Sequence, residues 1–191
     1  MDNFQHYTKG QWSSANNGKT IIKSEDGYNT VYASNVIKCD TNMVYKWTVK
    51  INEMSGSYCV IGIDESNYRH KQTRFYCEND GSFHYGYYSY FGYKYDSNGD
   101  ISAYSSDYDK GDTIAMKIDT ETNTLSFAKN SQKITKAFDI KATKNGYSLA
   151  ICAGYRNISF SILSFTKCNK NRNEIETKSN ESSDSKQKEI N

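Results

Sequence analysis

Histidine and cysteine side chains are the first candidates for chemistry in this 191-residue chain, because they bind metals and act as nucleophiles. No histidine stands in metal-ligand spacing with a cysteine or another histidine, and no CxxC pair is present. The sequence also contains no nucleophile elbow and no zincin motif. We therefore expect no metal, no cofactor and no enzymatic activity. The residues concerned are His6, His70, His84, Cys39, Cys59, Cys77, Cys152 and Cys168.

Two short motifs have the composition of ion-binding loops. Residues 17–20, NGKT, are similar to the end of a phosphate-binding loop, but that loop needs a glycine where Ser13 stands and an apolar strand before it. Residues 96–100, DSNGD, lack the ligand spacing and the distal glutamate of a calcium loop. We reject both sites and predict that residues 96–100 form a turn.

A basic cluster with aromatic neighbours occupies residues 68–75. Such a cluster fits either a nucleic-acid or phosphopeptide site or a solvated loop, and we favour the solvated loop. The formal net charge of +2 at pH 7 is too small to indicate a nucleic-acid or membrane partner. The cations of the cluster are Arg69, His70, Lys71 and Arg74.

The most unusual stretch of the sequence is an aromatic run at residues 83–95, in which eight of thirteen residues are Phe or Tyr. In an uninterrupted strand, residues of one parity face the core and those of the other parity face solvent or a second layer. We predict that most rings of the run are core, and that one or two reach a binding surface. The residues predicted to face the core are Phe83, Tyr85, Tyr87, Phe91, Tyr93 and Tyr95, and those of opposite parity are His84, Tyr88, Tyr90 and Lys94.

Period-two alternation predicts strands along most of the chain. Residues 43–51, MVYKWTVKI, alternate apolar and polar side chains and place Trp47 in the core. Residues 57–63, SYCVIGI, are apolar on both faces, so we expect a central strand that is covered on both sides. The linker EMSGS between them fits a hairpin loop, because it is short and contains Gly56.

Further strands are predicted in the second half of the chain. TIAMKID at 113–119 and TLSFAKN at 124–130 read as a hairpin, and GYSLAICAG at 146–154 is followed by NISFSILSF at 157–165. The apolar parity shifts by one residue within 157–165, which is typical of a β-bulge. No stretch has an extended helical period, so the pattern favours an all-β sandwich or barrel.

Composition divides the chain into an N-terminal arm at 1–9, a domain at 10–166 and a polar tail at 167–191. The tail has no aromatic and almost no aliphatic residue, so we expect it to be disordered. We find no segment long and apolar enough to span a membrane and no export signal. We therefore expect reduced cysteines and a cytoplasmic or nuclear location.

The order of the motifs resembles that of a SPRY domain, the core of the B30.2 module. The resemblance spans residues 10–166 and is strongest at 111–130, GDTIAMKIDTETNTLSFAKN. Ser131 stands where the family usually has glycine, and the proline common before the last hairpin is absent. The other matching segments are YKWTVKI with CVIGID, SYFGYKYDSNGD, and LAICAGYRNISFSIL, which resembles the family's closing hairpin.

The resemblance implies a concanavalin-like β-sandwich of two antiparallel sheets that is not an enzyme. SPRY domains bind proteins or short peptides through loops, often as substrate-recognition subunits of ubiquitin ligases or as scaffolds. We thus expect a monomeric protein-interaction module. A carbohydrate-binding, lectin-like domain is the alternative, because related sandwiches bind sugars and exposed tyrosines stack on sugar rings.

Two loop segments are candidates for the partner-binding site, because function concentrates in the loops at the ends of a sandwich. The turn AGYRN carries Tyr155 and Arg156, and in peptide-binding SPRY domains the position matching Tyr155 is often a pocket aromatic. A role for Tyr155 in capping the sandwich edge remains open. Between Glu65 and Ser82 the strand signal is weak, and the candidates there are Tyr68, Arg69, Arg74 and Tyr76.

Overall fold

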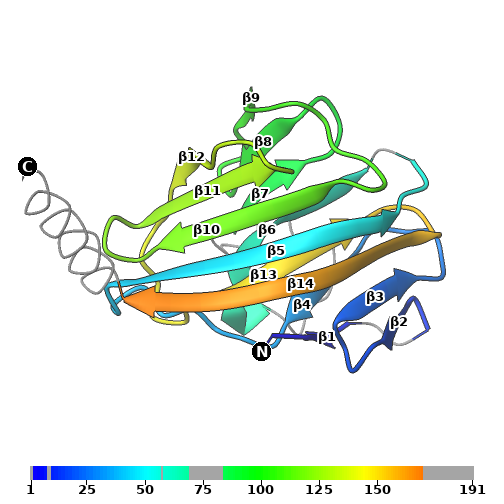
Figure 1. Ribbon diagram of the computed structural model, residues 1–191, viewed down its shortest axis with the longest axis horizontal. Helices are drawn as coiled ribbons and strands as arrows, with labels where there is room; N and C mark the ends of the chain where they lie inside the picture. Colours follow the sequence, from blue (N-terminus) through cyan, green and yellow to red (C-terminus); the bar gives the residue numbers. More distant parts are fainter. Residues whose placement is uncertain (1, 8–9, 57, 69–83, 170–191) are drawn as a thin grey trace, which may run out of the picture.

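Two antiparallel sheets of seven strands each pack face to face in the computed structural model, which describes residues 2–7, 10–56, 58–68 and 84–169 (Figure 1). The predicted all-β sandwich is thus confirmed. The only helix in this part of the chain is a single 3-10 turn, η1, at Ser66–Tyr68, and no described helix has the length and apolar character that crossing a membrane would require. The first sheet has the order β1 (Phe4–His6), β4 (Asn29–Ala33), β13 (Tyr147–Ala153), β6 (Cys59–Glu65), β7 (His84–Tyr88), β8 (Tyr93–Asp96) and β9 (Ile101–Ala103). The second has the order β12 (Thr135–Asp139), β11 (Thr124–Lys129), β10 (Thr113–Asp119), β5 (Met43–Glu53), β14 (Ile158–Asn169), β3 (Thr20–Lys23) and β2 (Trp12–Ala15).

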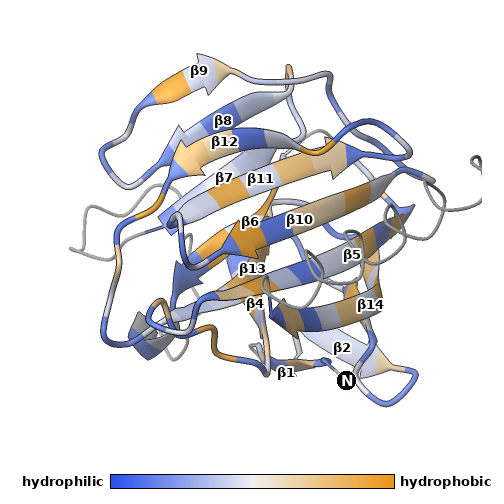
Figure 2. Cartoon of the chain, turned by 60° about the vertical axis from the view of Figure 1, so that its left-hand side comes forward, coloured by the Kyte–Doolittle hydropathy of each residue, from blue (hydrophilic) through white to orange (hydrophobic). Residues whose placement is uncertain are grey.

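The alternation predicted for β5 determines which of its side chains enter the core. Trp47, Val49 and Ile51 are completely buried, whereas Lys46 and Lys50, of the opposite parity, are exposed. Figure 2 shows the same alternation of hydrophobic and hydrophilic positions along the strands of this sheet. Trp47 is therefore a core residue, as the sequence predicted.

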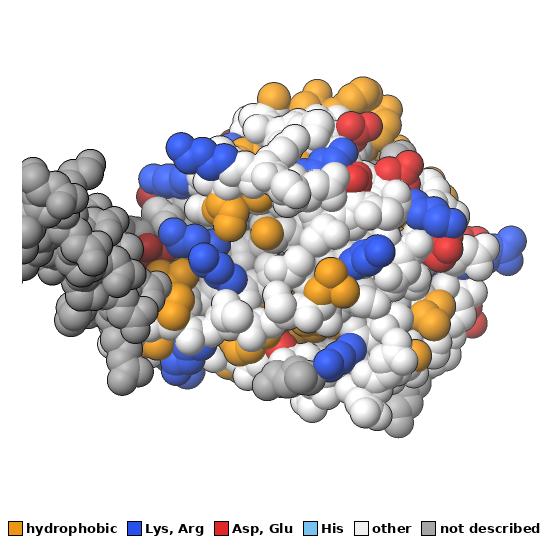
Figure 3. Space-filling view, in the orientation of Figure 1, with side chains coloured by type: hydrophobic (Ala, Val, Ile, Leu, Met, Phe, Trp, Pro, Cys, Tyr) orange, Lys and Arg blue, Asp and Glu red, His pale blue; other side chains and the backbone are white. Residues whose placement is uncertain are grey.

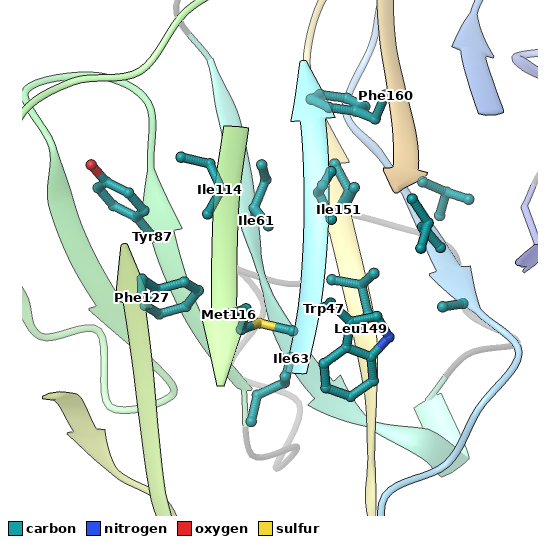
Figure 4. Packing of buried hydrophobic residues seen from close by; sticks show 14 of the residues in the cluster. Trp47, Ile61, Ile63, Tyr87, Ile114, Met116, Phe127, Leu149, Ile151 and Phe160 are labelled. Atoms are coloured by element: carbon teal, nitrogen blue, oxygen red, sulfur yellow. The ribbon is translucent and has the colours of Figure 1, made fainter. Parts of the chain in front are cut away.

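The core lies between the two sheets and draws apolar side chains from both. Met116 of β10 lies opposite Trp47 in the register of the second sheet, and Ile61 lies opposite Ile151 in the first. Figure 4 shows these side chains, with Phe127, pointing into the space between the sheets. Burial of one such side chain contributes roughly 1.5–3 kcal/mol, so this layer stabilises the framework that carries the loops.

Two connections that the sequence suggested as hairpins instead cross from one sheet to the other. β5 pairs with β10 and β14 in the second sheet, whereas β6 pairs with β7 and β13 in the first. The EMSGS linker therefore passes between sheets, and so does the AGYRN turn between β13 and β14. Both predicted hairpins were wrong, because alternation defines the faces of a strand but not the sheet that it joins.

Other local predictions are confirmed. β10 and β11 form the expected hairpin, with Asn123 in the left-handed region at φ 49°. The turn between β8 and β9 contains Gly99 at φ 82°, and the Asp96 carboxylate accepts the backbone N–H groups of Asn98 and Asp100. The bulge predicted in β14 lies at Leu163, where the register with β5 shifts and the side chain is exposed.

Both ends of the sandwich extend beyond the limits drawn from composition. Within the predicted arm at 1–9, β1 pairs with β4 and Phe4 is buried. The Asp2 carboxylate accepts hydrogen bonds from Trp47 Nε1 at 2.6 Å and from Ser34 Oγ at 2.7 Å, which ties the N-terminal segment to both sheets. β14 continues to Asn169, past the predicted boundary at 166, and the rest of the predicted tail lies outside the described residues.

Candidate functional site: an aromatic patch at one end of the sandwich

Antiparallel pairing brings the ends of four neighbouring strands together at one end of the first sheet. β4 and β6 begin there, and their neighbours β13 and β7 end there. Aromatic residues lie at or just beyond each of these ends. We call the group the aromatic patch; its members are Tyr28, Tyr58, Tyr88, Tyr90, Phe91 and Tyr155.

Tyr58, in the crossover between β5 and β6, is the centre of the patch. Its ring centroid lies 5.8 Å from that of Tyr155, 5.9 Å from that of Tyr90 and 6.1 Å from that of Tyr88. The Tyr28 ring meets it edge-on at 6.4 Å. These separations fall within the range of favourable aromatic pairs, so the rings hold one another in place.

The outer rings of the patch remain open to solvent. Tyr90 is 39% exposed, Tyr155 is 41% exposed and Phe91 is 59% exposed. The centroids of Tyr90 and Phe91 are only 3.9 Å apart, so the two rings form one continuous surface. Exposed apolar surface of this kind marks interaction sites in soluble proteins.

Two glycines leave room for the rings. A Cβ atom on Gly56 would lie 2.6 Å from Cδ2 of Tyr155, and one on Gly154 would lie 2.8 Å from Cε1 of Tyr28. Any larger residue at either position would displace the ring beside it. The β5–β6 crossover and the end of β13 are thus shaped to hold Tyr155 and Tyr28 where they lie.

A hollow of about 390 Å³ adjoins the patch, because two members of the patch, Tyr90 and Phe91, also line the hollow. It lies between the β5–β6 crossover, the β7–β8 turn and the loop from β9 to β10. Its lining combines an apolar, aromatic part, formed by Met54, Tyr90 and Phe91, with an acidic part, formed by Asp107 and Asp109, which we call the acidic wall. The lining residues are Met54, Gly56, Ser89, Tyr90, Phe91, Asp107, Tyr108 and Asp109.

The loop that carries the acidic wall is firmly anchored. The Tyr108 ring is buried, and its hydroxyl lies 3.0 Å from the carbonyl oxygens of both Cys59 and Tyr87. Burial raises the pKa of the Tyr108 hydroxyl well above its usual value, so it stays protonated and can donate. The backbone N–H groups of Tyr104 and Ser105 both donate to Gly92, which ties the loop to the β7–β8 turn.

Charges that contact the loop at Asp107 and Asp109 are paired within the protein. Asp112 accepts hydrogen bonds from Asn130 at 2.8 Å and from the Asp109 N–H at 2.9 Å, and it forms an ion pair with Lys129 at 3.1 Å. Partial burial raises the pKa of the Asp112 carboxyl, but these contacts outweigh the burial and leave the pKa below its ordinary value. Lys129 also donates to the Asp107 carbonyl at 2.8 Å, which fixes the loop backbone.

The structure places one predicted site residue in the patch and a second at its rim. Tyr155 contacts Tyr58, whereas the exposed Arg156 side chain lies 3.8 Å from the Asp26 carboxylate. Tyr68 is the last residue of η1. The other predicted site residues, Arg69, Arg74 and Tyr76, lie outside the described residues, as does most of the basic cluster.

Sequence reasoning misplaced one exposed ring of the aromatic run, Phe91, whereas Tyr90 was assigned to the parity that faces solvent or a second layer and is exposed. The parity rule places Phe91 in the core, but β7 ends at Tyr88 and the backbone turns before β8 begins at Tyr93. Phe91 and Gly92 have φ values of 58° and 64°, which reverse the chain and turn the Phe91 ring outward. Gly92 directly after the aromatic pair was the available signal, because glycine inside a strand pattern often marks an interruption.

The comparison with protein families gives a match, and the solved structures show the same fold. The SPRY domain family matches residues 44–170. The SPRY domain of human HERC1 is 21% identical, with a TM-score of 0.67 over 83% of this chain and 96% of that chain. The TRIM65 PSpry domain is 10% identical, with a TM-score of 0.60 over 85% and 92%.

A more distant structural likeness involves a sugar-binding protein. The carbohydrate-binding module CBM66 from Bacillus subtilis is 13% identical, with a TM-score of 0.51 over 86% of this chain and 96% of that chain. At this identity the likeness concerns the fold alone. No curated protein sequence matches the chain.

The family match covers more than half of the chain, and the buried Trp47 strand and the β10–β11 hairpin are two of the features on which the resemblance in sequence rested. This chain belongs to the SPRY domain family.

Proposed function

We propose that this SPRY domain is a non-enzymatic interaction module that holds a peptide segment or a protein surface against the aromatic patch. The observation that carries the proposal is the convergence of six rings from four strand ends, with Tyr90, Phe91 and Tyr155 exposed. Tyrosine and other aromatic side chains are common binding hot spots, because they supply rigid contact area at little entropic cost.

The position of the patch supports this role. It is built from the ends of paired strands, so its rings are held before a partner arrives and little ordering entropy is lost on binding. Arg156 at the rim can add a planar hydrogen-bonding group. Among the described residues, its guanidinium forms an ion pair only with Asp26, and that pair is exposed, so the guanidinium is available to a partner. We extend the proposal to a substrate-recognition or scaffold subunit, the use that SPRY domains often serve.

The test uses the full chain and a library of random twelve-residue peptides displayed on phage. Peptides enriched on the wild type are synthesised, and their affinities are measured for Phe91→Ala, Tyr155→Ala and Arg156→Ala. We expect Phe91→Ala and Tyr155→Ala each to weaken binding by about tenfold or more, the range of interface hot spots. Arg156→Ala should have a smaller effect, because its charge is exposed.

Leu163→Ala is the matched control, because Leu163 is an exposed apolar side chain on the β14 bulge and lies outside the patch. Circular dichroism and thermal unfolding establish that each variant is folded. Absence of peptide enrichment, or equal affinity for wild type and patch variants, would contradict the proposal. A glycan array tests the lectin alternative. Sugar binding that Phe91→Ala abolishes would favour that alternative.

A further inference from the structure

Two kinds of side chain line the hollow beside the aromatic patch. Tyr90 and Phe91 form an aromatic wall, and the exposed residues Asp107 and Asp109 form the acidic wall. Figure 3 shows acidic side chains, with basic ones between them, toward the right-hand end of the molecule, where Figure 1 places the β5–β6 crossover. Aromatic faces and carboxylates both attract cations, so the two walls favour the same kind of occupant.

The basic residues near the hollow do not neutralise this acidic wall. Lys110 pairs with Glu53 at 2.7 Å, and Lys129 pairs with Asp112 at 3.1 Å. Among the described residues, no lysine or arginine forms an ion pair with Asp107 or Asp109. No cation lines the hollow in the described part of the chain, so the negative potential there is open to a ligand.

We propose that the hollow receives an arginine or lysine side chain from the bound partner. This inference rests on the proposed function, because the rest of the partner segment lies on the aromatic patch. The cation stacks against Tyr90 and Phe91 and pairs with Asp107 and Asp109. Arginine fits best, because its flat guanidinium can stack on a ring and form bidentate hydrogen bonds with a carboxylate in its own plane.

Other occupants meet specific penalties in the same space. A phosphorylated or acidic side chain would be repelled by the two carboxylates. An apolar side chain could cover Phe91 and Met54, but it would remove water from Asp107 and Asp109 without giving them a partner. Charge complementarity thus distinguishes a basic segment from the alternatives.

The test again uses the full chain and the library of twelve-residue peptides. We compare selection on the wild type with selection on the double variant Asp107→Asn/Asp109→Asn. Asparagine keeps the size and an acceptor oxygen, including the one on Asp109 that accepts the N–H of Lys110 at 2.7 Å. Asp100→Asn is the matched control, because Asp100 is exposed in the β8–β9 turn and does not line the hollow.

We expect wild-type selections to be enriched in arginine or lysine at one position, and the double variant to lose that enrichment. Replacing that arginine with citrulline, which has the same shape without the charge, should weaken binding to the wild type by about tenfold. The double variant should bind the arginine peptide roughly three- to tenfold more weakly, whereas Asp100→Asn should match the wild type. Binding to the wild type should also weaken with added salt.

The outcomes separate the two proposals. Peptides that need Phe91 but show no basic residue, or that bind the double variant as tightly as the wild type, would overturn this inference and leave the aromatic patch as the site. Peptides enriched in acidic or phosphorylated residues would overturn it too. Absence of enrichment, or no dependence on Phe91, would overturn both proposals together.

Discussion

The aromatic run has a buried half in β7 and an exposed half in the turn that follows β7. Tyr85 and Tyr87 are 7% and 0% exposed, whereas Tyr90 and Phe91, three to six residues later, are 39% and 59% exposed. The residue types are nearly the same on both sides. The difference shows that the backbone around a ring, more than the ring itself, decides whether it stabilises the core or serves as a binding surface.

The physical cause lies in what surrounds each half. β7 is paired on both sides, by β6 and β8, and Tyr87 contacts Phe127 of the facing sheet at 5.6 Å. Tyr90 lies beyond the end of that strand, where its ring contacts are with other members of the patch. Rings in the strand are covered by the second sheet, whereas rings in the turn contact each other and neighbouring tyrosines and stay partly exposed.

Tyr87→Ala should have the largest effect on stability. It would empty a buried site packed against Tyr108 at 4.9 Å and Phe127 at 5.6 Å, so we expect a loss of about 3–5 kcal/mol in the free energy of unfolding. Urea unfolding followed by circular dichroism measures it. An unchanged midpoint would show that this half of the run does not support the core.

Gly92→Ala tests the turn that separates the two halves. A Cβ there would lie 2.0 Å from the Ser105 carbonyl oxygen, and φ is 64°. Gly99→Ala is the control, because its φ of 82° is also left-handed but nothing lies within 4 Å. The backbone conformation costs about 1–3 kcal/mol at either position, and the close approach makes Gly92→Ala clearly the worse. Equal midpoints in thermal unfolding would show that the contact with Ser105 is unimportant.

Tyr108→Phe tests the anchor of the acidic loop and should cost about 1–2 kcal/mol, because it leaves the carbonyls of Cys59 and Tyr87 without this donor. A pH series gives a second readout. Burial raises the folded-state pKa of Tyr108 above its ordinary 10.0, so the unfolded chain releases this proton first and wild-type stability falls as pH rises above 10.0. The variant should lose stability less steeply there; an identical slope would count against the buried hydroxyl.

Phe91→Ala should have the smallest effect on stability. Its ring is exposed and packs on Tyr90 and Tyr93, so we expect a change within about 0.5 kcal/mol, as for most surface positions. Combined with the loss of peptide affinity proposed above, this would assign the ring to binding. A loss of stability as large as that of Tyr87→Ala would remove the distinction between the two halves of the run.

The faces of the long strands could be predicted from the sequence, because side-chain period two is a local property. Trp47 in the core and the bulge near Leu163 follow from it. The crossovers after β5 and β13 could not be predicted, because period two says nothing about which sheet the next strand joins. That choice depends on pairing between distant residues, such as Ile61 with Ile151.

The sequence by itself determined the all-β class, the core faces and Tyr155 as a candidate for binding. Only the tertiary structure decided that Tyr58 and Phe91 share a surface with Tyr155, and that Asp107 and Asp109 face the same hollow. The members of the patch come from segments far apart in the chain. They meet because one of two antiparallel strands begins where its neighbour ends, at the same end of the sheet. That arrangement exists only once the sheet has formed.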